Sequence, residues 1–285
     1  MPTRRIGDRT VSAIGLGGMP MSVRPDNVEE QSLATIRTAI ELGVTLIDTA
    51  DAYCHDEGDF GHNEVLIAKA LAQLGATDDV LVATKGGHTR RGSAWAQNGR
   101  PDYLLEACRA SAQRLGVEQI GLYQFHRPDP KVAFEDSIGA LKTLLDDGSI
   151  ARAGISNANP AQIRSAHEIL GDGLVSVQNQ YSPAFRSSEP EIDVCDELGL
   201  AFLPWSPIGG MSGAAGLGDD YAAFGSVARK HDVSPQQVAL AWELARSANV
   251  IPIPGASRPE SVSDSLGAVH LDLDAEDLAE LSAPA

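Results

Sequence analysis

Polar residues that could take part in catalysis end three short apolar runs of this chain. Asp48 ends the run VTLID, Lys85 ends VLVATK and His126 ends LYQFH, and Tyr53 lies one short turn after Asp48. The regular spacing of these runs predicts successive parallel strands, and parallel strands separated by helices bring their carboxyl ends to one edge of a barrel. The sequence therefore predicts that these four side chains converge.

The four residue types suit proton transfer. A lysine ammonium about 4 Å from a tyrosine contributes roughly 4 kcal/mol at an effective dielectric of about 20, or roughly three pKa units before desolvation is subtracted, so Lys85 is expected to stabilise the Tyr53 phenolate and activate Tyr53. Burial favours the neutral form of a lysine, and Asp48 is expected to keep Lys85 charged. The alternative is a buried Asp–Lys pair that only closes a layer of the barrel, which leaves Tyr53 and His126 unexplained.

Three segments that carry these residues resemble the aldo-keto reductase superfamily: DTADAY (48–53), ATKGG around Lys85 and LYQFHRPD around His126. The chain is most similar to short-tailed bacterial members. The resemblance implies that Tyr53 is the general acid, that Lys85 and Asp48 tune it, and that His126 orients the substrate carbonyl. It also implies an NAD(P)H-dependent reduction of aldehydes or ketones to alcohols.

The pattern of apolar runs predicts the fold. Candidate strands alternate with helical patterns at a period near 30 to 40 residues, as a (β/α)8 TIM barrel requires. At 285 residues we expect a single barrel domain, 1–285, with an extra N-terminal hairpin arm over 4–10. The eight expected strands are Val11–Leu16, Val44–Asp48, Val80–Lys85, Ile120–His126, Ala151–Ser156, Leu174–Gln178, Leu200–Trp205 and Val250–Ile253.

Composition excludes several classes of function. The formal charge of −17 argues against nucleic acid or an anionic membrane as a partner. The N-terminus lacks an apolar signal core and no run is long enough to span a membrane, so the cytoplasm is the expected location. Three cysteines without paired spacing suggest reduced thiols. The seven histidines show no HxH or HExxH spacing, so no metal site is expected.

A second group of residues follows the later strands. Ser156, Asn157 and Gln178 offer hydroxyl and amide groups suited to holding a carboxamide, and Trp205 offers a flat face. Each signal alone is weak, because Ser-Asn after a strand commonly caps a helix and a lone Trp commonly lies in the core. The resemblance implies that these positions bind the nicotinamide, together with the segment that follows Trp205: Ser206, Pro207, Ile208 and Gly209.

The eighth strand runs into IPIPGASRPESVSDSL (251–266), where a glycine is followed by a helix start, and Arg258 offers a planar fork for phosphate. The resemblance makes this the adenosine 2′-phosphate site and NADPH the cofactor. Because the segment departs from a familiar Lys-Ser, Arg and Glu-Asn version of the motif, NADH is kept as an alternative. The cofactor residues expected here are Ile253, Gly255, Ala256, Ser257, Arg258, Ser261, Asp264 and Ser265.

The substrate side depends on the segment Gly86–Arg100, which is long enough to fold over the barrel mouth. It holds Trp95 as its only large aromatic residue, expected to contact substrate, and four basic residues: His88, Arg90, Arg91 and Arg100. These basic residues could attract an anionic or phosphorylated aldehyde. The alternative, which we favour from the sequence, is a solvated surface loop.

Two other functions remain open at this stage. One is a Schiff-base aldolase with Lys85 as nucleophile, which requires a neutral lysine that Asp48 opposes. The other is a catalytically weak, NADP(H)-binding regulatory protein, against which the intact tetrad argues. For the enzyme we expect a small-molecule carbonyl substrate and a monomer or weak homo-oligomer.

Overall fold

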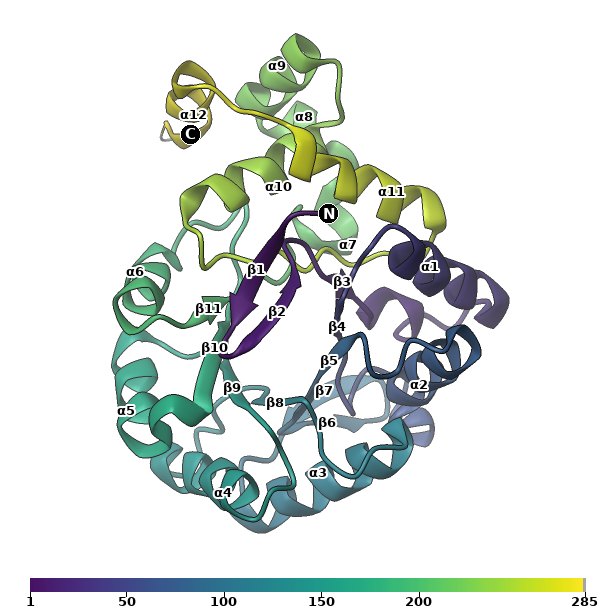
Figure 1. Cartoon of the computed structure of the whole chain (residues 1–285), viewed down its shortest axis with the longest axis vertical. Coiled ribbons are helices and arrows are strands. Elements are labelled where there is room, and N and C mark those ends of the chain that lie inside the picture. Colours follow the sequence, from purple (N-terminus) through teal and green to yellow (C-terminus); the bar gives the residue numbers. More distant parts are fainter. Residues whose placement is uncertain (284–285) are drawn as a thin grey trace.

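A curled sheet of seven parallel strands forms the centre of the molecule (Figure 1). The computed structural model describes residues 1–283, apart from the side chains of 211 and 212. Neighbouring strands in the sheet follow the order β11, β10, β9, β8, β5, β4, β3. Their bounds are β3 Leu16–Gly17, β4 Leu46–Asp48, β5 Leu81–Gly86, β8 Leu122–Phe125, β9 Ala153–Ser156, β10 Leu174–Gln178 and β11 Ala201–Phe202.

The segment 250–255 takes the eighth position and closes the barrel between β11 and β3. Single parallel bridges join Val250 to Phe202 and Gly255 to Gly17. The backbone oxygens of Pro252 and Pro254 accept hydrogen bonds from Gly15 and Gly17, each at 2.9 Å. Because proline has no N–H to return a bond, this side of the ladder is incomplete. The expected strand Val250–Ile253 is therefore an extended segment rather than a regular strand, although the (β/α)8 arrangement is confirmed.

The first expected strand, Val11–Leu16, is wrong in its placement. Its first two residues belong to β2 (Arg9–Ser12), which pairs antiparallel with β1 (Thr3–Ile6), and the barrel strand begins only at Leu16. The expected N-terminal hairpin is present and lies across one end of the barrel (Figure 1). Ile6 and Val11 belong to the same buried cluster as Leu46 and Leu122, so the hairpin seals this end with apolar side chains.

Helices surround the barrel as a ring. Asn159 caps α5 through a reciprocal capping box with Gln162, and glycines in the left-handed conformation end α2, α3 and α6. The helices α8, α9 and α12 extend beyond the ring (Figure 1). The bounds are α1 Glu29–Glu41, α2 His62–Leu74, α3 Pro101–Leu115, α4 Phe134–Asp146, α5 Pro160–Leu170, α6 Glu189–Leu198, α7 Gly210–Gly213, α8 Leu217–Asp220, α9 Ala222–His231, α10 Pro235–Arg246, α11 Pro259–Gly267 and α12 Ala275–Ser282, with 3-10 turns at Met19–Met21, Glu57–Asp59, Gly171–Gly173, Ala214–Gly216 and Ala268–His270.

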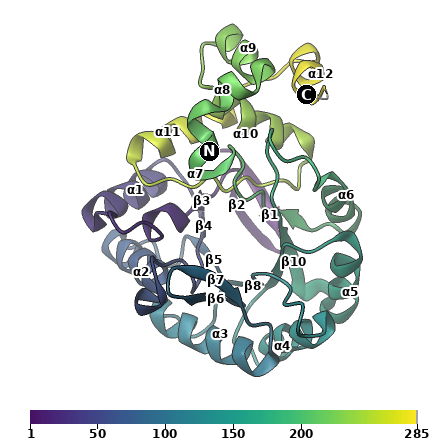
Figure 2. The same ribbon diagram turned by 180° about the vertical axis from the view of Figure 1, so that it is seen from behind.

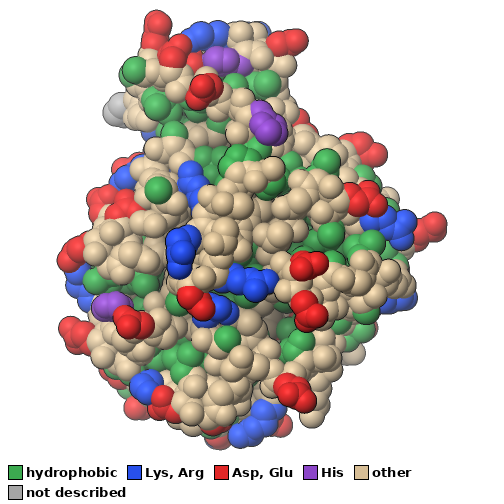
Figure 3. Space-filling view, viewed as in Figure 1, with side chains coloured by type: hydrophobic (Ala, Val, Ile, Leu, Met, Phe, Trp, Pro, Cys, Tyr) green, Lys and Arg blue, Asp and Glu red, His purple; other side chains and the backbone are tan. Residues whose placement is uncertain are grey.

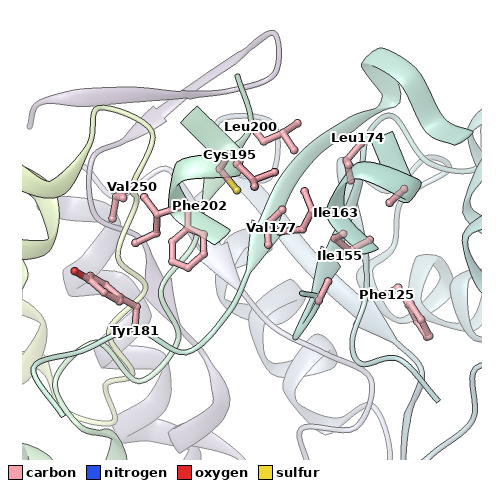
Figure 4. Close-up of a cluster of buried hydrophobic side chains, with 14 of the residues drawn as sticks. Phe125, Ile155, Ile163, Leu174, Val177, Tyr181, Cys195, Leu200, Phe202 and Val250 are labelled. Carbon is pink, nitrogen blue, oxygen red and sulfur yellow. The ribbon is translucent and has the colours of Figure 1, made fainter. Parts of the chain in front are cut away.

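Large apolar clusters lie between the sheet and its helices. Figure 4 shows one of them, in which Phe125, Ile155 and Val177 of the strands lie near Ile163 of α5 and Cys195 of α6. All five side chains are fully buried. Burial of apolar surface at this density stabilises the barrel wall and holds the strand ends in place.

The segment after β5 is a second antiparallel hairpin rather than an irregular loop. Its strands are β6 (His88–Arg91) and β7 (Ala94–Gln97), paired from His88 with Gln97 to Arg91 with Ala94. Seen from behind, this hairpin lies at the end of the barrel opposite to β1 and β2 (Figure 2). The carboxyl ends of the parallel strands are therefore covered by a defined structure.

The surface at the end sealed by β1 and β2 carries acidic and basic side chains interspersed with small apolar areas (Figure 3). Within residues 1–283, no helix is both long and apolar enough to cross a membrane. Cys54, Cys108 and Cys195 are all buried and unpaired, as the sequence suggested.

Candidate active site

The strand ends bring Asp48, Tyr53 and Lys85 into direct contact. Asp48 is the last residue of β4, Lys85 lies near the end of β5, and Tyr53 lies in the segment between β4 and α2. Lys85 Nζ donates to Asp48 Oδ2 at 2.7 Å and to Tyr53 Oη at 3.1 Å. A third bond, at 2.8 Å, goes to the backbone oxygen of Thr49, so all three ammonium protons have acceptors. The predicted convergence of these residues is therefore present in the structure.

The environment of Lys85 keeps it charged. Burial, the largest single effect, lowers the pKa of Lys85, because the side chain is completely excluded from solvent. The charge of Asp48, the neighbouring Tyr53 and their hydrogen bonds together outweigh burial, so the pKa lies above its ordinary value. Lys85 is an ammonium at neutral pH.

Lys85 favours the Tyr53 phenolate, but desolvation of the phenol outweighs this effect. Burial is the largest effect and raises the pKa of the phenol above 10, while the charge of Lys85 offsets only part of this shift. Asp48 adds to the rise, because a carboxylate disfavours a phenolate beside it. Tyr53 is therefore a protonated phenol near neutrality, which suits a group that donates a proton.

Asp48 is held on both of its oxygens. While Oδ2 accepts from Lys85, Oδ1 accepts from Gln178 Nε2 at 2.8 Å and from Gln124 Nε2 at 3.4 Å. These amides come from β10 and β8, so three strands fix the carboxylate. Gln178, which the sequence predicted to bind the cofactor, donates this hydrogen bond to Asp48.

His126 directly follows β8 and faces Tyr53, with 5.6 Å between the ring centroids. Burial, followed by the charges of nearby groups, holds the pKa of His126 well below its ordinary value, so the ring is neutral. Its Nδ1 is buried and has no hydrogen-bond partner among the described residues. His126 therefore presents a neutral imidazole to the cavity.

These residues form one end of a cavity of about 1140 Å³. The residues expected at a cofactor line the same cavity, except that Gly210 takes the place of Gly209. Strand ends β9 to β11, the closing segment and helix α11 supply them. They are Ser156, Asn157, Gln178, Trp205, Ser206, Pro207, Ile208, Ile253, Gly255, Ala256, Ser257, Arg258, Ser261, Asp264 and Ser265.

The polar groups after β9 are linked to one another. Ser156 Oγ donates to the backbone oxygen of Gln178 at 2.7 Å, and Asn157 Nδ2 donates to Ser156 Oγ at 2.9 Å and to the backbone oxygen of His126 at 3.0 Å. Asn157 adopts the left-handed conformation, with φ of 59°, which turns its amide into this network. Trp205, which lines the same cavity, has a buried Nε1 without a partner in the described part of the chain.

The other end of the cavity is open. Arg258 precedes α11 as its N-cap residue, is exposed, and forms no ion pair within residues 1–283. Gly17 and Gly255, which also line the cavity, let β3 and the closing segment approach closely, because a Cβ on Gly17 would lie 2.8 Å from the backbone oxygen of Ile253. The carboxylate of Asp264 is bound to Ser234 and Gln237, so it serves the packing of α11 against α10.

The segment expected as a solvated loop is the β6–β7 hairpin, in which Arg91 and 92–95 are exposed while Arg90 is buried. Arg90 is only 9% exposed and donates to the backbone oxygens of Ala52, Cys54 and Ser93 at 2.7 to 3.1 Å. Its guanidinium lies 3.4 Å from the ring of Trp95. Trp95 in turn meets Tyr53 edge to face, at 6.4 Å between the ring centroids, and lines the cavity. Arg90 therefore anchors the hairpin and is not available to a ligand.

Arg127 is a cavity residue that the sequence reading did not single out. It lies in the segment HRPD directly after His126, and a cation next to a strand-end histidine was the available signal. Arg127 Nη2 donates to Asn157 Oδ1 at 2.8 Å, and its Nε donates to His88 Nε2 at 3.3 Å. Further lining residues that were not predicted include Met19, Pro20 and Arg24 from the loop after β3, and Gln236 and Glu260 from α10 and α11.

Among residues 1–283, no group of three or more His, Cys, Asp or Glu side chains is arranged to hold a metal ion. The buried Lys–Asp pair supplies the charge that would stabilise a developing phenolate.

A sequence model of the aldo/keto reductase family matches residues 13–284. A probable aldo-keto reductase from Glycine max is 34% identical over 95% of this chain and 84% of its own length. An uncharacterized oxidoreductase from Schizosaccharomyces pombe is 33% identical over 98% and 88%.

Solved structures agree with the sequence comparisons. A thermostable aldo-keto reductase in complex with the inhibitor epalrestat superposes with a TM-score of 0.84 at 27% identity, covering 99% of this chain and 98% of its own. An aldo/keto reductase from Klebsiella pneumoniae in complex with NADP and acetate gives 0.81 at 26% identity, covering 98% and 93%. Together with the position of Tyr53, Lys85, Asp48 and His126 at the strand ends, these matches establish that the chain belongs to the aldo/keto reductase family and is an oxidoreductase.

Proposed function

We propose that this protein reduces aldehydes or ketones to alcohols with NADPH, and that Tyr53 is the general acid. The observation that carries the proposal is the chain of hydrogen bonds from Asp48 through Lys85 to the Tyr53 hydroxyl at the wall of the cavity. A phenol with a raised pKa stays protonated at neutral pH, and a neighbouring ammonium stabilises the phenolate that remains after the proton leaves.

Each residue of the site has its own role in the proposed reaction. NADPH, when bound, supplies the hydride for the carbonyl carbon. Tyr53 donates its proton to the carbonyl oxygen, while Lys85 holds the resulting phenolate charge and Asp48 keeps Lys85 charged. His126 is neutral, so its Nε2–H can hydrogen-bond the same oxygen and orient the substrate.

The cavity fits a nicotinamide dinucleotide. The unpartnered Trp205 Nε1 and the hydroxyl and amide groups of Ser156 and Asn157 line one part of it, where they would hold the nicotinamide. Arg258 lines the same cavity and is exposed, so its guanidinium can bind a phosphate. Two similar structures were solved with NADP or NADPH, which supports the same cofactor here.

The charged state of Lys85 argues against an aldolase. A Schiff base requires a neutral amine, yet Lys85 has a raised pKa and donates three hydrogen bonds. A regulatory protein that binds NADP(H) without turnover would keep the same cavity, so only an assay separates it from the enzyme.

The test is the loss of NADPH absorbance when the protein is mixed with a panel of neutral aldehydes and ketones. We expect turnover with at least one member of the panel, and a shift in NADPH fluorescence on binding. Binding without turnover on any carbonyl compound would favour the regulatory function. Absence of both signals would contradict the proposal.

A further inference from the structure

We propose that Arg127 binds a carboxylate on the substrate, and that the protein prefers carbonyl compounds carrying such a group. This inference rests on the proposed function and names its substrate class. Arg127 lines the cavity and directly follows His126, the residue proposed to orient the carbonyl. A guanidinium presents a planar set of donors that matches the geometry of a carboxylate.

The groups that hold Arg127 in place leave part of its guanidinium without a hydrogen-bond partner among the described residues. Its Nε and Nη2 donate to His88 and Asn157, and Nη1 donates no hydrogen bond to the described residues. Asn157 is itself fixed through the backbone oxygen of His126. The guanidinium is thus preorganised by neutral partners, and a ligand does not have to displace any of them.

No carboxylate neutralises Arg127. It forms no ion pair within residues 1–283. The nearest acidic residue in sequence, Asp129, accepts instead from the backbone N–H groups of Gly99 and Lys131. Such an uncompensated, half-buried cation stands out in a chain with a formal charge of −17.

Of the groups near Arg127, His88 adds no charge and Arg90 adds a second cation. His88 accepts a hydrogen bond from Arg127 at Nε2 and is neutral, because burial and the nearby cations lower its pKa to about 4. Arg90 donates hydrogen bonds to backbone oxygens, so it contributes positive charge but no direct contact with the substrate. In a cavity of restricted dielectric, two such cations attract an anionic substrate.

The other basic residues near the mouth do not fit this role. Arg91 is exposed on the β6–β7 hairpin, and Arg100 is paired with Asp102 on the surface. Neither lines the cavity. The anionic substrate considered from the sequence is therefore retained, but its binding group moves from the hairpin to Arg127.

The test compares two aldehydes of the same shape, 4-carboxybenzaldehyde and 4-nitrobenzaldehyde, of which only the first is charged. Arg127→Gln should raise KM for the carboxylate by at least about tenfold, the loss expected for a hydrogen bond to a charged group. KM for the nitro compound should change less than about twofold, because a neutral substituent gains little from the charge. Arg91→Gln removes the same charge from the exposed hairpin and should leave both values unchanged.

Added salt gives a second readout. KM for the carboxylate should rise with ionic strength in the wild type and in Arg91→Gln, and much less in Arg127→Gln. Equal losses on both aldehydes in Arg127→Gln would overturn the inference and assign Arg127 to holding Asn157. That outcome leaves the proposed function intact, since the wild type would still reduce both compounds. Failure of the wild type on the carboxylate while other members of the carbonyl panel are reduced would also overturn the inference, whereas failure on the whole panel would count against the proposed function itself.

Discussion

The two ends of the cavity differ in how the protein surrounds the cation found there. At the catalytic end, Lys85 is fully buried, and each of its donors has an acceptor within 3.1 Å. At the other end, Arg258 is exposed and has no ion-pair partner in the described chain. One end is complete without a ligand, whereas the other end offers a cation to solvent.

This difference separates chemistry from binding. A buried, fully bonded group needs no reorganisation during reaction, so its removal should lower kcat. An exposed cation is solvated in the free protein and contributes only when a charged ligand arrives, so its removal should weaken ligand binding. The following predictions test that division, in order of decreasing effect.

The largest effect is expected for Tyr53→Phe. It removes the proposed proton donor and keeps the ring, so kcat for carbonyl reduction should fall at least about a hundredfold, the scale of general acid catalysis. The measurement is the steady-state loss of NADPH absorbance with the best neutral aldehyde. Lys85→Met should also lower kcat, because it removes the charge that stabilises the phenolate.

The control is the dissociation constant of NADPH, followed by its fluorescence. Tyr53→Phe should leave this constant close to the wild-type value, since the phenol hydroxyl lies at the catalytic end. Near-normal turnover in this variant would remove Tyr53 from the mechanism, and a large loss of NADPH affinity would break the division between the two ends.

A smaller effect is expected for Arg258→Ala, which should weaken NADPH binding by about 1.5 kcal/mol, roughly tenfold. We place it at the low end of the range for charged hydrogen bonds because Arg258 is exposed. NADH, which lacks the 2′-phosphate, should bind almost as it does to the wild type. Equal losses for the two dinucleotides would show that Arg258 does not recognise this phosphate.

Trp95→Ala should have a still smaller effect. The side chain is 45% exposed, and losing part of its apolar contact costs about 1 kcal/mol, roughly fivefold in KM for a bulky aldehyde. The value of kcat should stay near normal, because contact of this kind binds ground state and transition state alike. A small aliphatic aldehyde serves as the matched control. A fall in kcat on both substrates would mean that Trp95 positions Tyr53, its neighbour in the cavity.

The smallest effect concerns pH. The pKa of Tyr53 is raised above 10, that of His126 is well below 6.5, and that of His88 is about 4, so none of the three titrates near neutrality. Reduction needs protonated Tyr53 and neutral His126, so kcat/KM should be flat from about pH 6 to about pH 9. A fall below pH 7 would show that His126 has an ordinary pKa.

The convergence of Asp48, Tyr53, Lys85 and His126 was readable from the sequence because it depends on local rules. Each short apolar run ends at a polar residue, and the βα repeat sends all strand ends to one edge. The left-handed glycine that ends α2 and the Asn159 cap of α5 follow local rules of the same kind, since they depend on the backbone preferences of single residues.

The first and last barrel strands were harder to place. Val11 and Ser12 continue the β pattern of Leu16, so nothing local separates the hairpin from the barrel strand. Pro252 and Pro254 lie in an apolar run that looks like a strand, but they lack the N–H groups that a regular ladder needs. Pairing partners decide both cases, and these partners are distant in sequence.

The amino-acid sequence determined which groups are present at the strand ends and hence the kind of chemistry that this protein can perform. The tertiary structure alone decided their electrostatic state: burial raises the pKa of Tyr53 where the neighbouring lysine alone would lower it. It also decided that Arg90 donates its hydrogen bonds to backbone oxygens, whereas Arg127 lines the cavity. Desolvation and hydrogen-bond geometry depend on every group packed around a side chain, and that surrounding exists only once the chain has folded.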